Sequence, residues 1–146
     1  DLESPMLALK EQSIASVLGI GKPTSAMGYV AAIERGLPIQ SLERVTRQIA
    51  PGDSDFKYRL IAKATLARRQ KAKRLSPEES DRLSRIAQVW SCALDVWQTE
   101  VDARAFLNRP HALLEGRTPI EAALKTEVGA RMVEEILGRL KHGTAA

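Results

Sequence analysis

The stretch that decides the fold class covers residues 76–98 and reads SPEESDRLSRIAQVWSCALDVWQ. It opens with Ser76 as a helix N-cap, Pro77 at the first helical position and Glu79 three residues after the cap, which together form a capping box. Apolar side chains then recur at steps of three, four and seven residues, at Leu83, Ile86, Trp90 and Trp97. The stretch is therefore predicted to form one long amphipathic helix.

The rest of the chain also shows helical patterns, and it contains no alternating run of β-branched residues that would predict a strand. Glycine or proline residues mark the ends of several of these patterns. We therefore predict an all-α fold. Beside the long helix, the predicted helices cover residues 5–18, 25–35, 38–49, 54–60, 64–71, a short segment through 105–107, a segment that starts after Thr118, and 126–140. Thr118 is the predicted N-cap of its segment, because Pro119 and Glu121 follow it as in a capping box.

The composition is that of an ordinary globular chain, because 44% of its 146 residues are hydrophobic and 27% are charged. No stretch approaches the ~18 consecutive apolar residues of a membrane span, and residues 1–5 show no signal-peptide pattern. The single cysteine, Cys92, excludes an internal disulfide and fits a reducing cytoplasm, which is the predicted location. One cysteine and two histidines cannot fill a four-ligand zinc site without carboxylates, so no metal site is predicted.

The net charge of +4 is unevenly distributed along the chain. Residues 56–74 contain eight lysines and arginines and no acidic residue, whereas residues 1–55 and 75–146 each have a net charge of −2. A charge spread for solubility would alternate in sign. The basic segment therefore indicates a binding site for a polyanion, with nucleic acid as the leading candidate. A solvated helix face is the alternative interpretation.

Two short predicted helices, residues 54–60 and 64–71, lie in this basic segment and are joined by a tight connection near residues 61–62. This arrangement is typical of a helix-turn-helix, although the turn lacks the usual glycine. Leu66 is expected to anchor the second helix to the core while polar side chains face outward to bases and phosphates. The candidate DNA-binding residues are Lys63, Thr65, Arg68, Arg69, Gln70, Lys71 and Lys73.

Small helix-turn-helix proteins read two half-sites about one helical turn apart, one with each copy, so we expect the protein to be at least a dimer. Ile86, Trp90 and Trp97 on the long helix are the candidate dimer interface. The same stripe also fits a core that is wholly intramolecular, and the sequence leaves that alternative open.

The sequence contains no catalytic motif, so we expect a protein that is not an enzyme and has no cofactor or small-molecule substrate. It lacks a Gly-x-Ser-x-Gly elbow, a His-Glu-x-x-His motif, a cysteine pair and a glycine-rich loop after a strand. In the loop at residues 19–24, Pro23 separates Lys22 from Thr24, so the spacing of a phosphate-binding loop is absent.

Several blocks of the C-terminal half occur at fixed spacing: residues 103–107, Pro110, and residues 114–121, 126–131 and 138–143. Together they strongly resemble the C-terminal toxin-binding domain of Xre/MbcA/ParS-type antitoxins. Upstream, residues 66–69 and 75–83 are similar to the recognition helix and linker of the Xre-like helix-turn-helix in the same proteins. The resemblance covers residues 25–143 and is weakest at residues 56–61, which depart from the usual pattern.

This resemblance implies a type II antitoxin that neutralises a co-encoded toxin and represses its own operon by binding double-stranded operator DNA. The C-terminal residues look most like antitoxins of RES-type toxins, which implies an NAD-consuming partner. The implied domains are an N-terminal extension at residues 1–24, a helix-turn-helix region at 25–75, and a linker helix with a toxin-binding domain at 76–146. A stand-alone repressor is the alternative, but it would have no need of the block at residues 116–143.

The resemblance also implies where the toxin binds. We expect the end of the last helix, residues 138–143, to dock at the toxin and obstruct its NAD site. The apolar residues Val128, Met132, Ile136 and Leu140 are expected to pack inward or on the toxin. Alternatively, the basic residues only stabilise the C-terminus of that helix. The candidate toxin-binding residues are Phe106, Leu107, Gly116, Arg117, Thr118, Pro119, Arg131, Arg139, Lys141 and His142.

Overall fold

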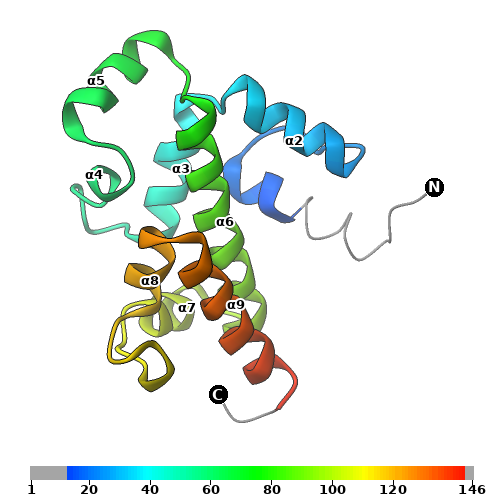
Figure 1. The fold of residues 1–146 in the computed structure, drawn as a ribbon, viewed down its shortest axis with the longest axis vertical. Helices are drawn as coiled ribbons and strands as arrows, with labels where there is room; N and C mark the ends of the chain where they lie inside the picture. Colours follow the sequence, from blue (N-terminus) through cyan, green and yellow to red (C-terminus); the bar gives the residue numbers. More distant parts are fainter. Residues whose placement is uncertain (1–12, 144–146) are drawn as a thin grey trace. The chain divides into compact units, whose positions relative to one another are not determined.

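The computed structural model describes residues 13–143, and over this range the regular elements are helices, as predicted (Figure 1). Residues 13–18 are helical, and the part of the predicted first helix before residue 13 lies outside the described residues. The elements that follow are α2 (Ala26–Arg35), α3 (Ile39–Ile49), α4 (Lys57–Leu60), α5 (Lys63–Ala72), α6 (Pro77–Trp97), α7 (Glu100–Leu107), η1 (Ala112–Leu114), α8 (Pro119–Lys125) and α9 (Glu127–Lys141).

The chain forms two compact units, the first ending at Ala87 and the second beginning at Gln88. The division falls within α6, whereas the sequence placed a domain boundary between residues 75 and 76, at the start of this helix. The first eleven residues of α6 therefore belong to the helix-turn-helix unit.

Two helical features differ from the sequence-based expectation. The helix predicted from residue 54 begins only at Lys57, because the Asp53 side chain accepts a hydrogen bond from the Asp55 amide (2.9 Å) and holds a turn there. The short 3₁₀-helix η1 was not predicted. His111 caps it by accepting a hydrogen bond from the Leu113 amide through Nδ1 (3.1 Å).

In the first unit, α3 supports the neighbouring segments through buried contacts. The Ser41 hydroxyl donates a hydrogen bond to the Leu18 carbonyl (2.7 Å), which fixes the helical segment 13–18 against α3. The buried side chains of the unit are mainly apolar. They include Ile14, Leu18, Leu37, Leu42, Val45, Ile49, Phe56, Leu60, Leu66, Leu75 and Leu83.

Two extended segments beside α3 pair in an antiparallel manner and connect its start to the end of α5. The Ile39 amide donates to the Lys73 carbonyl (3.1 Å), and the Leu75 amide donates to the Leu37 carbonyl (2.8 Å). Gly36 precedes this pairing with a φ of 89°, and a Cβ there would lie 2.3 Å from the Leu75 carbonyl oxygen. Only glycine fits this position, for both conformational and steric reasons.

In the second unit, three threonines cap the three helices α7, α8 and α9. Thr99, Thr118 and Thr126 each accept a hydrogen bond from the backbone amide three residues later. Thr126 is also the only residue between α8 and α9, so these two helices form a tight hairpin. The capping function predicted for Thr118 is confirmed.

The close approach of α8 and α9 depends on Gly129. A Cβ at this position would lie 2.1 Å from the carbonyl oxygen of Ala122, which is far inside van der Waals contact. The Ala122 oxygen belongs to the backbone, so it cannot rotate away as a side chain could. Gly129 is therefore required by packing between the helices, since it lies within the regular helix α9.

We predict that Gly129→Ala destabilises the second unit by about 1–3 kcal/mol, because the added methyl group forces α8 and α9 apart. Gly138→Ala is a matched control on the same helix, since nothing lies within 4 Å of the methyl group it adds. That control should be neutral or stabilising by up to about 1 kcal/mol. Thermal unfolding followed by circular dichroism tests both, and an unchanged melting temperature for Gly129→Ala would contradict the packing argument.

Candidate functional site

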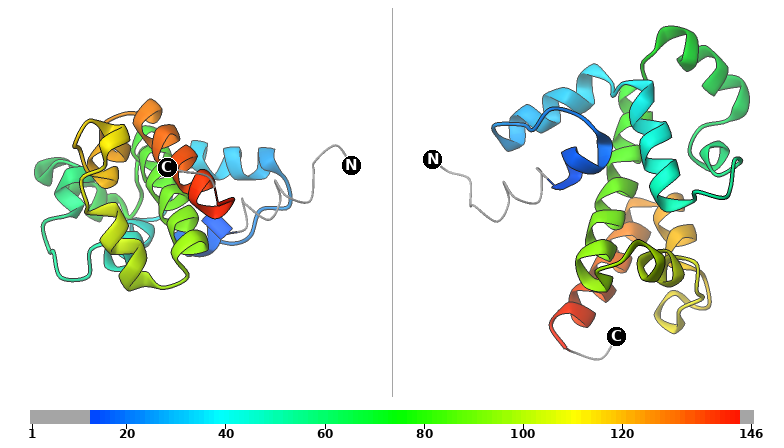
Figure 2. Two further views of the ribbon diagram at one scale, coloured as in Figure 1. Left: turned by 90° about the horizontal axis from the view of Figure 1, so that it is seen from below. Right: turned by 180° about the vertical axis from the view of Figure 1, so that it is seen from behind.

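The predicted helix-turn-helix is formed by α4 and α5, with only Ile61 and Ala62 between them. Leu60, Ile61 and Leu66 are buried and anchor the pair, and Leu66 is the one buried residue of α5. Figure 2 shows that α5, in green, lies at the periphery of its unit in views from below and from behind. The remaining surface of α5 is therefore open to a partner.

The outer face of α5 combines basic or amide side chains with small ones. The sequence-predicted residues Lys63, Arg68, Gln70, Lys71 and Lys73 are all exposed, while Thr65 and Arg69 are half-buried. Between them lie exposed alanines, which keep the helix narrow enough to approach the floor of a major groove. These alanines are Ala64, Ala67 and Ala72.

The basic surface also extends onto α4. The Lys57 and Lys63 ammonium groups lie 5.4 and 5.6 Å from the centre of the Tyr58 ring, one from each helix of the motif. Such cation–π contacts hold the two lysines on a common surface. Sequence reasoning counted Lys57 among the basic residues but did not include it or Tyr58 in the site.

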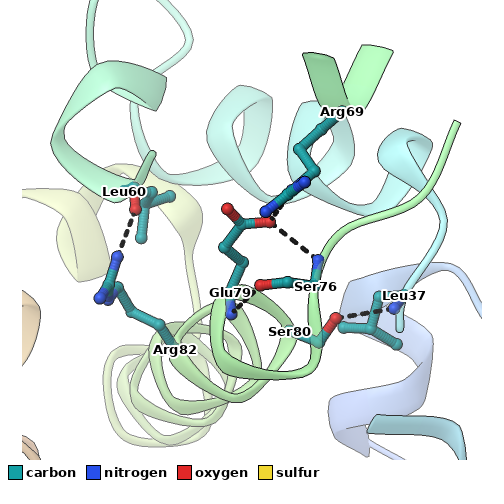
Figure 3. Close-up of polar contacts among 7 residues, drawn as sticks. All are labelled: Leu37, Leu60, Arg69, Ser76, Glu79, Ser80 and Arg82. Atoms are coloured by element: carbon teal, nitrogen blue, oxygen red, sulfur yellow. Dashed lines mark hydrogen bonds and ion pairs between the residues drawn. The ribbon is translucent and has the colours of Figure 1, made fainter. Parts of the chain in front are cut away.

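Arg69 faces α6 and forms an ion pair with Glu79, with Nε 2.7 Å from Oε1 (Figure 3). The same carboxylate accepts a hydrogen bond from the Ser76 amide (2.8 Å), and the Glu79 amide donates to the Ser76 hydroxyl (3.1 Å). The predicted capping box is thus confirmed. Its glutamate has a second function, because it fixes the recognition helix to the start of α6.

The Glu79 side chain is only 11% exposed. Burial by itself raises the pKa of this carboxyl group, but the hydrogen bonds and charge of Arg69 and the hydrogen bonds of Ser76 outweigh burial and hold its pKa below the usual value. The hydrogen bond to Glu79 in turn raises the pKa of Arg69. The ion pair is therefore fully charged at neutral pH.

Two further side chains of α6 hold the motif, and no sequence pattern predicted either contact. The Arg82 guanidinium donates to the Leu60 carbonyl at the end of α4 (2.7 Å), and the Ser80 hydroxyl accepts a hydrogen bond from the Leu37 amide (2.7 Å). Figure 3 shows that Ser80 and Arg82 point to opposite sides of the helix. The first turns of α6 thus fix α4, α5 and the segment before α3.

In the second unit the predicted toxin-binding residues divide by exposure. Gly116, Arg117, Arg131, Arg139, Lys141 and His142 are exposed, and Lys141 forms an ion pair with Asp95. Thr118 is half-buried and occupied in capping α8. The other three predicted toxin-binding residues, Phe106, Leu107 and Pro119, are buried. The structure corrects the prediction for them, since buried side chains leave no surface for a partner.

Comparison with known proteins agrees with this arrangement. Residues 29–88 match the antitoxin Xre-like helix-turn-helix domain, and residues 92–143 match the antitoxin Xre/MbcA/ParS C-terminal toxin-binding domain. An antitoxin Xre of Photorhabdus laumondii is 30% identical over 128 residues, which are 85% of this chain and 86% of that protein. The chain belongs to the Xre family of antitoxins. A second antitoxin Xre, from Yersinia enterocolitica, is 37% identical over 71 residues, 48% of this chain and 47% of the relative.

The antitoxin therefore has a DNA-binding unit and a toxin-binding unit, and the two matched domains follow the two compact units closely. Within residues 13–143, no group of three or more histidine, cysteine, aspartate or glutamate side chains is arranged to hold a metal ion. Over the same described range, none of the helices is both long and apolar enough to cross a membrane.

The predicted dimer interface of the antitoxin needs correction. Ile86 and Trp90 are 0% exposed in the single chain, so they cannot contact a second copy. Trp97 is half-buried and packs on Phe106, with 5.7 Å between ring centres. The stripe is a core, which is the alternative that the sequence left open.

We predict that acid weakens the DNA-binding unit through Glu79. Because the folded-state pKa of Glu79 lies below its unfolded-state value of about 4.3, the stabilisation is complete above that value and is lost as the pH falls through the folded-state pKa. Glu79→Gln should therefore lower the melting temperature at pH 7. Between pH 7 and pH 3, the melting temperature of this variant should fall by less than that of the wild type. Glu78→Gln, which removes an exposed neighbouring carboxylate, is the control. Equal acid sensitivity in Glu79→Gln and the wild type would contradict this assignment.

Proposed function

We propose that this antitoxin represses its own operon by placing α5 in the major groove of operator DNA. The observation that carries the proposal is the exposed outer face of α5, which presents Lys63, Arg68, Gln70 and Lys71 around exposed alanines. Arginine and glutamine can read base edges, and lysine can neutralise phosphates. The eight positive charges of residues 56–74 add the sequence-independent attraction to the duplex.

Within this proposal, Arg69 acts as a positioning residue. Its guanidinium is committed to Glu79 on α6, so it sets the orientation of α5 and does not itself read DNA. Thr65 and Lys73 lie at the two ends of the helix, and Lys73 adopts a left-handed conformation (φ 63°) that ends it. We assign both to contacts with the DNA backbone.

We further propose that the antitoxin is a homodimer on DNA, because a single helix-turn-helix covers only one half-site. The contact between copies must use surface other than Ile86 and Trp90, since both are buried in the single chain. Binding to two half-sites would then follow the two-fold symmetry of the dimer.

For the second unit, we propose that it neutralises a co-encoded RES-type toxin that consumes NAD. The resemblance of residues 103–143 to antitoxins of that pairing supports the toxin class. The end of α9 supports the mode of inhibition, because Arg139 and His142 are exposed there and could pair with the polar or acidic groups of an NAD site. The carbonyl groups at this helix end add acceptors for donors on the toxin.

We predict that the double substitution Arg68→Glu with Lys71→Glu weakens binding to the DNA upstream of the antitoxin gene by at least about tenfold, because it reverses two phosphate- or base-facing charges. Arg109→Glu, an exposed arginine of the second unit, is the matched control and should bind as the wild type does. Fluorescence anisotropy with a labelled duplex measures both. If the affinity of the wild-type protein for the duplex does not change between about 50 and 200 mM salt, the proposed electrostatic contribution to DNA binding is refuted.

We predict that expression of the adjacently encoded toxin lowers cellular NAD, and that co-expression of the antitoxin restores it. Deletion of residues 139–146 should abolish this rescue, because it removes the polar end of α9, while circular dichroism still shows the remaining helices. Unchanged NAD in cells that express the toxin alone would contradict the proposed toxin class. Full rescue by the shortened antitoxin would show that the end of α9 is only a helix terminus.

A further inference from the structure

We propose that an apolar groove along α9 binds an amphipathic helix of the toxin, with acidic side chains flanking the apolar face of that helix. The groove lies wholly in the second unit, where α9 is flanked by the segment that contains η1 and by the second half of α8. This inference rests on the proposed function, because it assumes that the second unit binds a toxin.

The groove is made of two adjoining cavities that share Leu113 and Met132. The larger, of about 340 Å³, continues to Val128 and Gly129, and the smaller, of about 180 Å³, continues to Ile136 and towards the end of α9. Its lining on α9 recurs every three or four residues, so the groove follows one face of the helix. A groove of this form matches the helix-in-groove mode of recognition.

Exposed apolar side chains gather at this groove. Leu113, Val128 and Met132 are 45%, 56% and 40% exposed, and all three line the larger cavity. Val101 is 70% exposed on the same unit but lines neither of these two cavities. Scattered single apolar residues are normal on a protein surface, whereas three that line one concave site mark an interaction surface.

Gly129 helps to form the groove. Because this residue has no side chain, α9 approaches the Ala122 carbonyl closely, and Ala122, Thr126 and Gly129 all line the larger cavity. Val128 and Met132 lie one turn apart on α9, on either side of Gly129 in the sequence. The tight hairpin therefore creates the hollow that the two apolar side chains border.

The charges along the groove determine the chemistry of its occupant. Arg117 and Lys125 line the larger cavity, and Arg139 lines the smaller one, all with exposed side chains. Two acids, Glu115 and Glu135, leave the lining with a net positive charge. An apolar helix with acidic flanks complements this pattern, because its carboxylates can pair with the basic rim while its apolar face fills the hollow.

The test uses the full-length antitoxin and the purified toxin encoded beside it. Val128→Glu and Met132→Glu should each weaken toxin binding by at least about tenfold, because each places an unpaired carboxylate in an apolar contact. Leu113→Glu tests the same groove from η1, on the opposite side. Val101→Glu changes an exposed apolar residue that lines neither cavity, so it is the matched control and should bind as tightly as the wild type.

Circular dichroism and binding to the upstream DNA show that each variant is folded, and titration calorimetry gives the toxin affinities. Lys125→Glu should also weaken toxin binding, and the effect should shrink at high salt. If the variants at Leu113, Val128 and Met132 all bind the toxin with wild-type affinity, the groove is not the binding site, and the proposed function remains intact. A wild-type antitoxin that does not bind the toxin would overturn the proposed function itself. If the groove variants instead convert a dimer of the free antitoxin into monomers in light scattering, the occupant is a second copy and the proposal is wrong.

Discussion

The geometry of the DNA-binding unit depends on one carboxylate, that of Glu79. It closes the first turn of α6 by accepting a hydrogen bond from Ser76, and it holds α5 through the guanidinium of Arg69. Because the carboxylate is mostly buried, water competes less for these two contacts than it does for those of an exposed ion pair. The start of the longest helix and the orientation of the recognition helix are thus set by a single side chain.

Sequence reasoning succeeded where the signal is local. The capping residues Ser76 and Thr118 and the exposure of most polar residues of α5 follow from spacing within one helix, and the structure has them as predicted. It failed where the deciding contact joins distant segments. The partner of Arg69 is ten residues away on another helix. The helical period of 3.6 residues shows that Ile86 and Trp90 lie on one face of a helix, but it does not show which residues cover that face. A three-residue 3₁₀-helix such as η1 has no periodic signal at all.

The resemblance to a family caused a different kind of error. Phe106 and Leu107 belong to the block 103–107 and Pro119 belongs to the block 114–121, and the resemblance carried by these blocks predicted that all three contact the toxin. All three are buried, so their distinctive spacing reflects how this small unit packs its core. The groove that we propose is lined by Leu113, Val128 and Met132. Sequence reasoning left open whether Val128 and Met132 pack inward or on the toxin, and the structure shows that both are exposed.

The single buried residue of α5 has a consequence for how such antitoxins diverge. Leu66 is the only side chain that this helix gives to the core, and Arg69 is its connection to α6. The other outward positions contribute little to folding stability, since exposed substitutions usually change it by less than about 0.5 kcal/mol. In the proposed mode of DNA binding, these positions are therefore free to change together with the operator sequence. Related antitoxins in one cell could acquire separate operators through α5 alone, with the remainder of the fold unaltered.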